Sequence, residues 1–349
     1  TDLGGDLTPA PTLAVPYAQS GSLLAVNRSI TLLQSAGPLS NVPVLNNGQA
    51  VQGASLIYDY SLAQSGNSIV ATINGVKLNP QAKALSQGRL AGLASLGMGA
   101  DLVAGAGINN ALAAANAANS VASAGNSVAS AGNSGNSSAA PAAGSDAANS
   151  GTFGNLAPAG GSEQGYGLVP FMAVSTSFLR YNVGSNMDVD GAAVLLGLAK
   201  KWQGSSAEFL LGAFAEASLS NNKSHNSFSK QASVTGKSDN DSVGGGILAR
   251  MELTGTALKG LYTEASLRVG QLNSHYNSSD LQDYLGNNAS YDTNSLYYGA
   301  HAGLGYILAL SDKASLDLYA KYFWTHQEGE NMTILGDEFK FDDVNSQRT

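Results

Sequence analysis

The sequence predicts a mainly β fold: an antiparallel transmembrane β-barrel, incomplete with about eight strands present, preceded by an Ala/Gly-rich helical segment and a short β-solenoid-like stalk end. Three observations predict it. Runs with a period of two fill the C-terminal half, with one apolar face and one small or polar face. Charges of both signs lie on the second face. Tight connections alternate with long polar ones, as in transmembrane barrels.

Composition limits the possible partners and chemistry. The 349 residues include 42 glycines and no cysteine, with a net charge of -8, and this length allows two or more domains. An acidic chain without a basic stripe argues against a nucleic-acid interface. Absence of cysteine excludes disulfides, thiolate metal sites and a thiol nucleophile. No run of about 18 apolar residues occurs, so we expect strands, not a helix, to form any membrane span.

Residues 1–75 contain short alternating runs, SLLAVNRSITLL from Ser22 and SLIYDYSLAQSGNSIVATI from Ser55. Turn signals occur at Asn46-Asn47-Gly48 and at Ser65-Gly66-Asn67. Short strands with polar turns and few charges indicate the last rungs of a β-solenoid. No signal segment follows Thr1, so any targeting peptide is expected upstream or already removed.

The hydrophobic period changes in residues 76–118, a predicted helical linker that starts at Asn79-Pro80. Apolar and small residues recur there at spacings of three and four, including Leu85, Gly88, Gly92, Leu96 and Gly99. Each glycine costs about 1 kcal/mol relative to alanine. Such a helix is tolerated best inside a supporting tube; an ordinary surface helix is the alternative.

Residues 119–166 form a predicted low-complexity flexible spacer. The heptapeptide NSVASAG occurs at Asn119 and again at Asn126. Alanine, serine, glycine and asparagine bury too little apolar area to offset the entropy of ordering. Helical character is expected to fade beyond Gly125.

Residues 167–349 contain the predicted barrel strands. They are 170–181, 189–202, 207–216, 243–253, 261–270, 291–310, 316–324 and one starting at Phe339. Tight connections are expected near 203–205, Gly255 and 311–313, and long polar loops over 221–239 and 273–291.

The small or polar face of these strands carries the candidates for a barrel lumen. They are Glu208, Glu216, Arg250, Glu252, Glu264, Arg268, His301, Asp317 and Lys321. Inside a dry sandwich, unpaired charges of this kind would cost several kcal/mol apiece. A lumen filled with water or with a polar-sided helix accommodates them, which favours a barrel over a soluble β fold.

The other face carries the candidates for lipid contact. They are Leu296, Tyr298, Leu304, Tyr306, Leu316, Leu318 and Trp324. In the stretch 291–310, Gly299, Gly303 and Gly305 alternate with them and are expected to make room for whatever fills the lumen.

The order of segments resembles the C-terminal part of a monomeric, type Va autotransporter. The motifs are YDYSLAQSGNSIVATI, AKALSQGRLAGLASLGMGADLVAG, FMAVSTSFLRYNVGSNMDVDGAAVLLGLAKKW and, from Phe339, FKFDDVNSQRT. The resemblance implies a passenger end (1–75), a linker helix (76–118), a spacer (119–166) and a translocator barrel (167–349). It also implies that the spacer is unusually long and that the chain stops about four strands before a complete barrel.

That resemblance further implies a location in the bacterial outer membrane and export of the chain's own passenger to the cell surface. The implied partners are outer-membrane lipid, the passenger segment and the barrel-assembly machinery. The alternatives are a porin-like channel and an extracellular adhesin without its own barrel.

No enzymatic chemistry, metal or cofactor is expected. Asn186, Asp188, Asp190 and Gly191 imitate the start of a calcium loop, but the twelfth position is Gly197 instead of glutamate. The four histidines lack metal-binding spacing, and a rim hydrolase site would need His275 to act with Asp280 or Asp283.

One dipeptide, Asn109-Asn110, resembles the place where some autotransporters release the passenger by asparagine cyclisation. The alternative is an ordinary polar pair on a helix.

Overall fold

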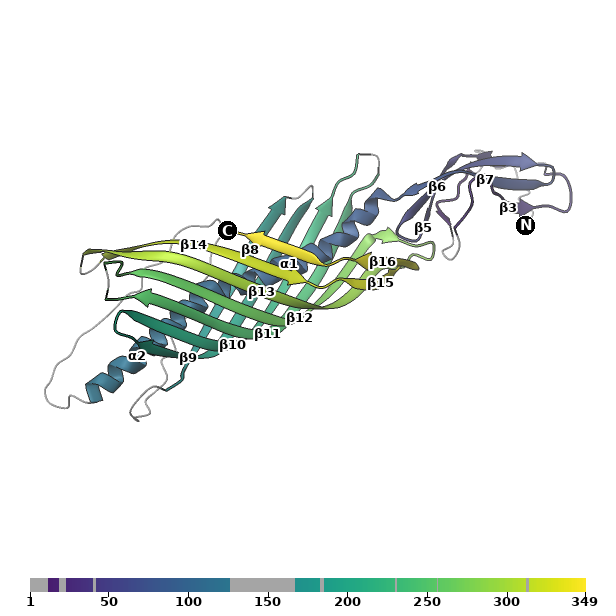
Figure 1. The fold of residues 1–349 in the computed structure, drawn as a ribbon. Coiled ribbons are helices and arrows are strands. Elements are labelled where there is room, and N and C mark those ends of the chain that lie inside the picture. The colour runs from purple at the N-terminus through teal and green to yellow at the C-terminus, as the bar shows by residue number, and fades with distance from the viewer. Residues whose placement is uncertain are drawn as a thin grey trace.

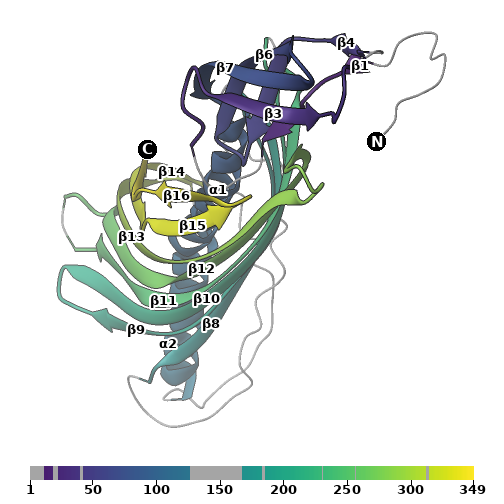
Figure 2. The same cartoon turned by 90° about the vertical axis from the view of Figure 1, so that its right-hand side faces the viewer.

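The computed structural model describes residues 12–18, 23–39, 42–125, 167–182, 185–229, 231–255, 257–311 and 314–349. It is mainly β, with a large eight-stranded antiparallel sheet, one long helix and a smaller N-terminal sheet. The large sheet is curved, and the helix runs along its concave face (Figures 1 and 2). Most of the predicted spacer, residues 126–166, lies outside the described residues.

The N-terminal sheet has five strands in the order β2-β5-β6-β7-β3, beside a separate pair, β1 and β4. Their bounds are β1 Thr12–Leu13, β2 Tyr17–Ala18, β3 Ser29–Gln34, β4 Val44–Leu45, β5 Gly48–Gln52, β6 Leu56–Ser65 and β7 Ser68–Leu78. The pairs β1·β4 and β2·β5 are parallel, as between solenoid rungs, whereas the others are antiparallel. The buried side chains of Tyr58 and Tyr60 lie in the core of this sheet. Their hydroxyls accept hydrogen bonds from backbone amides in the preceding loops. The solenoid assignment stays a prediction.

The long helix begins as predicted, with Pro80 at its first turn and the Asn79 side chain accepting from the amide of Gln81. It comprises a 3-10 turn, η1 Pro80–Leu85, then α1 Ser86–Leu102, a π turn, η2 Val103–Gly107, and α2 Ile108–Gly125.

The expectation that no helix could span a membrane is wrong, because one helix of the described residues is long enough and apolar enough to do so by length and composition. Residues Pro80–Ala118 qualify with a mean hydropathy of 1.4, although 72% of their most apolar window is buried within the fold. Scattered glycine, serine and asparagine interrupt every apolar run, yet the many alanines and leucines keep the average high.

The large sheet has the order β17-β14-β13-β12-β11-β10-β9-β8. The bounds are β8 Val169–Asn182, β9 Asn186–Gln203, β10 Ala207–Asn226, β11 Val234–Leu253, β12 Leu261–Gln282, β13 Asn288–Ser311, β14 Ala314–Gln327 and β17 Val344–Arg348. Seven predicted strands match members of this sheet. Within the described residues its edge strands, β8 and β17, do not pair with each other.

The predicted eighth strand, starting at Phe339, is wrong in position. Phe339 lies in a separate hairpin formed by β15 Glu330–Ile334 and β16 Asp337–Phe341. Positive φ angles at Leu335 and Gly336 make the two-residue turn that such hairpins prefer. The alternating pattern therefore belongs to two elements, and only β17 joins β14.

The predicted long loops over 221–239 and 273–291 are also wrong. Strands β10 and β11 are paired up to Asn226 and Val234, and β12 and β13 up to Gln282 and Asn288. Their inward side chains here are small and polar, and they bond one another, as Asn222 does with Ser238. Because the backbone ladder supplies the pairing, strands continue where apolar residues stop.

Candidate functional site: a charged concave face that holds a helix

Burial alternates along every central strand of the large sheet, which confirms the predicted two-faced pattern. By strand register, all nine lumen candidates lie on the concave face, toward the helix. The structure gives each of them a charged or hydrogen-bonding partner there. Gly299, Gly303 and Gly305 lie on the same face, beside the side chains of Arg268, Glu264 and Tyr262.

Glycines on the helix allow the wall to approach closely. A Cβ added to Gly88 would lie 2.5 Å from the hydroxyl of Tyr291 and 2.9 Å from the ring of Tyr276. A Cβ on Gly99 would lie 2.6 Å from Nη1 of Arg268. The glycines that weaken this helix in isolation therefore make its contact with the sheet possible.

The first charged cluster joins Glu216, Arg268 and Tyr297. The Arg268 guanidinium donates to both Glu216 oxygens at 3.1 and 3.0 Å, and the Tyr297 hydroxyl donates to the same carboxylate at 2.6 Å. Side-chain exposure is only 3% for Arg268 and 6% for Glu216. Arg268 also donates to the backbone carbonyl of Leu96, so the buried pair holds the helix as well as itself.

The second cluster surrounds Glu264. Lys321 lies 2.7 Å from its carboxylate, and Arg250 and His301 each lie 3.5 Å away. Lys321 Nζ also donates to the carbonyl of Ala104 at 2.6 Å. Ala104 lies in the π turn, where the altered backbone ladder leaves carbonyls accessible to side-chain donors.

Sequence reasoning did not pick out several residues of this face. Tyr291 donates to the carbonyl of Leu85 at 2.6 Å, Tyr262 donates to Asp317 at 3.0 Å, and Lys201 pairs with Glu208 at 2.6 Å. Tyr262 and Tyr291 lie in step with the predicted inward positions, so the period of two could have found them. Lys201 lies in residues 189–202, for which alternation did not assign an inward face.

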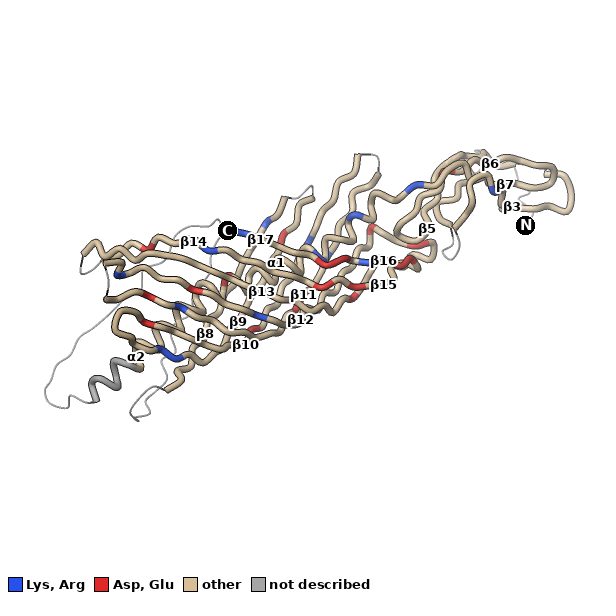
Figure 3. The backbone as a smooth tube through the Cα atoms, viewed as in Figure 1, with Lys and Arg blue, Asp and Glu red and all other residues tan. Residues whose placement is uncertain are grey.

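The convex face carries an exposed apolar band that crosses β9 to β14. Its members include Leu196, Leu198, Phe209, Leu211, Ile247, Leu267, Val269, Leu296, Tyr298, Leu304, Leu316, Leu318 and Tyr322. The lipid candidates all lie on this convex face, with Tyr306 and Trp324 half-buried. Beyond the band, toward the N-terminal sheet, outward positions become polar, as at Asp241 and Asn273. Figure 3 shows where the charged residues fall along the strands.

The asparagine pair lies in α2, directly after the π turn. The Asn110 side chain donates to the carbonyl of Met172 on β8 at 2.7 Å, whereas Asn109 is exposed. Asn110 therefore ties the helix to the first strand of the sheet, and cleavage at this pair stays a prediction.

Other candidate chemistry is not assembled in the described residues. There, no group of three or more His, Asp or Glu side chains is placed to hold a metal. Asp188 of the calcium-like motif pairs instead with Arg180 at 2.5 Å, and that guanidinium lowers the pKa of the Asp188 carboxyl. The rim hydrolase site, in which His275 would act with Asp280 or Asp283, is wrong, because His275 Nδ1 lies 2.6 Å from Asp292 instead.

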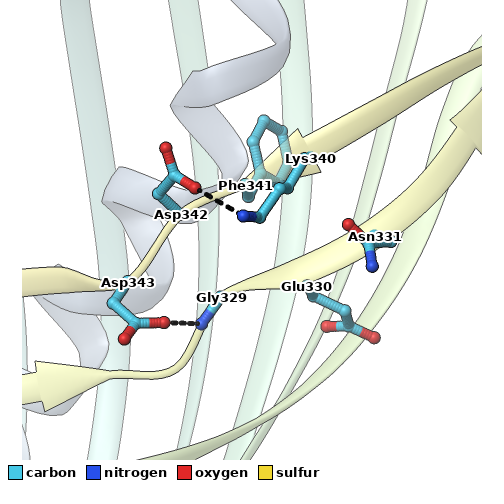
Figure 4. Close-up of a pocket in the computed structure, with 7 residues that line it drawn as sticks. All are labelled: Gly329, Glu330, Asn331, Lys340, Phe341, Asp342 and Asp343. Carbon is cyan, nitrogen blue, oxygen red and sulfur yellow. Dashed lines mark hydrogen bonds and ion pairs between the residues drawn. The ribbon is translucent and has the colours of Figure 1, made fainter.

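A crevice of about 370 Å³ lies at the base of the β15–β16 hairpin. Figure 4 shows that its polar groups serve the hairpin itself: Lys340 pairs with Asp342 at 3.3 Å, and the Asp343 carboxylate accepts from the amide of Gly329 at 2.7 Å. Glu330 points away from them in this view and accepts from the amide of Asn294. Polar groups so engaged suit a structural role better than substrate binding.

No family model, no curated protein and no solved structure matches the chain. A function can therefore be inferred only from the two-faced sheet and from the helix along its concave face.

Proposed function

We propose that this chain is an outer-membrane translocator and anchor that exports its own N-terminal passenger to the bacterial cell surface, without catalysis. The supporting observation is one sheet with an exposed apolar band outside and paired charges inside. Monomeric soluble proteins rarely expose apolar patches larger than a few hundred Å². Lipid outside and a helix inside provide each face with a suitable environment.

The height of the band fits a bilayer. Outward residues on β11 are apolar over 243–253, a span of about 34 Å at roughly 3.4 Å per residue. At a strand tilt of about 45°, this is about 25 Å across the membrane, close to the apolar band of known barrels. Closure of the sheet into a barrel is part of the proposal.

The path of the chain supports export of an N-terminal segment. The helix leads from the N-terminal sheet, at one end of the large sheet, through the hollow to α2 at the other end (Figure 1). A passenger attached upstream would then lie outside the cell while its linker occupies the pore. Assembly by the barrel-assembly machinery and contact with outer-membrane lipid belong to the same proposal.

The helix argues against a porin-like channel. Beside Gly99, Glu216 and Arg268, the space between helix and wall has no room for a water molecule. The apolar band argues against an extracellular adhesin, whose strands would meet water on the convex face.

The complete protein provides the test. If the proposal is right, it migrates differently in gels before and after heating, because folded transmembrane barrels resist detergent, and it shows little steady conductance in planar bilayers. Unchanged migration on heating would reject a barrel and favour the adhesin. Large, steady conductance would favour the porin.

A further inference from the structure

The β15–β16 hairpin does not extend the large sheet. It leaves the end of β14 and returns to β17, and between them it lies over the start of the helix (Figures 1 and 2). Its apolar side chains pack in one cluster with residues of the helix start, of strands β11, β12 and β13, and of the N-terminal sheet. Fully buried Ile334 lies in this cluster with Ala54 and Leu85.

One carboxylate connects the hairpin tip to the N-terminal sheet. Asp337 Oδ2 accepts from the amides of Ala54 and Ser55 at 3.0 and 2.9 Å, and from the Ser55 hydroxyl at 2.5 Å. Three donors on one oxygen form a strong charge-assisted arrangement. The contact spans more than 280 positions of the chain, so local folding alone does not produce it.

The turn that Asp337 binds is shaped for it. Gly53 has a φ of +57°, which favours glycine, and a Cβ there would lie 2.4 Å from the Asp337 carboxylate. From the other side, the amide of Asn79 donates to the Ser55 carbonyl at 2.7 Å, and its side chain donates to the Ala54 carbonyl at 3.2 Å.

A second contact fixes the base of the hairpin. Arg89, on the helix, donates to the carbonyls of Gln327, Glu328 and Asp342 at 3.3, 2.6 and 3.0 Å. Its guanidinium also lies 5.9 Å from the ring centre of Phe341. The hairpin is therefore held at its base by the helix and at its tip by the N-terminal sheet.

We propose that the β15–β16 hairpin is a latch that fixes the base of the N-terminal sheet at the end of the large sheet where the helix begins. Asp337 is its positioning residue, and the turn at residues 53–55 is the segment that it binds. The donors at Ala54 and Ser55 converge only once the turn has formed. The latch therefore closes only on a folded N-terminal sheet. This inference does not depend on the large sheet lying in a membrane or transporting anything.

Hydrogen exchange on the purified complete chain tests the latch. In Asp337→Asn, the amides of Ala54 and Ser55 are expected to exchange about tenfold faster or more, because the charged acceptor is lost. The control is Glu338→Gln, an exposed neighbour on the same strand, which should leave exchange unchanged. Equal exchange in Asp337→Asn and wild type would overturn the proposal.

Cross-linking gives an independent readout in this cysteine-free chain. The double variant Ser55→Cys/Asp337→Cys should be joined by a short bis-thiol reagent several times faster than Ser55→Cys/Glu338→Cys. Equal rates for the two pairs would place the hairpin tip away from the turn and overturn the latch, whatever the outcome of transport assays.

Discussion

The two faces of the large sheet are built from the same strands but are stabilised differently. On the concave face, charged side chains such as Arg268 and Glu264 are buried, paired and in contact with the helix or with groups that bond it. On the convex face, leucines and tyrosines are exposed and have no comparable core. The difference teaches that the helix completes the inner face, whereas in the described residues nothing covers the outer face, which we propose lies in lipid.

Breaking a buried pair should have the largest effect. Arg268→Met leaves Glu216 buried without its partner and is expected to cost about 3–5 kcal/mol of stability, measured by urea unfolding. The double variant Glu216→Gln/Arg268→Met should recover much of this loss. Arg180→Ala, in an exposed pair, should change little. Equal losses in the single and double variants would contradict the role of charge.

A charge on the convex face should have the next largest effect in a bilayer. Leu267→Arg, within the apolar band, is expected to cost about 2–4 kcal/mol of folding stability in lipid vesicles. Asn273→Arg, on the same strand and face but beyond the band, is the matched control. If both variants fold into vesicles equally well, the band does not lie in lipid.

Steric change on the helix tests how closely the concave face holds it. Gly88→Ala places a methyl group against Tyr276 and Tyr291 and should cost about 1–3 kcal/mol in urea unfolding. Gly97→Ala is the control, because its Cβ would make only an ordinary contact at 3.9 Å. That variant should be neutral or slightly stabilising, since alanine favours helix. Equal costs would mean that the wall does not approach the helix at Gly88.

The smallest effect is expected at an exposed pair in the N-terminal sheet. Hydrogen bonds from Lys77 and Gln49 lower the pKa of the Asp59 carboxyl. A lowered folded-state pKa gives stability that is present above the unfolded value of about 3.9 and is lost as the pH falls through the lower folded value. Because both partners are more than one-third exposed, Lys77→Ala should remove no more than about 1 kcal/mol. Unfolding at pH 6 and pH 3 measures this; a variant that keeps the wild-type pH dependence would contradict it.

The alternation of residues predicted which face each strand residue occupies, because side chains of a strand point alternately to either side. It assigned Glu264 and Lys321 to one face correctly. It could not predict that they meet, because the register between β12, β13 and β14 depends on turns and on packing with the helix.

Two features could not be predicted from the sequence, for physical reasons. The β15–β16 hairpin is fixed by Asp337 and Arg89 through contacts distant in the chain, and alternation alone shows no break between β16 and β17. The polar strand extensions have no apolar signal, since their pairing comes from the backbone and from small hydroxyl and amide side chains.

The π turn determines which side of α2 faces the sheet. Buried positions continue through the turn at Val103, Ala104 and Gly107, and along α2 at Ile108, Ala111 and Ala115. Since an α-helix has 3.6 residues per turn, one extra residue rotates everything after it by about 100°. Without that rotation, Ile108 and Ala111 would turn away from β8 and β9. Removal of one residue at Gly105 would therefore rotate α2 by about 100° about its axis and move Ile108 and Ala111 off their contacts with the sheet.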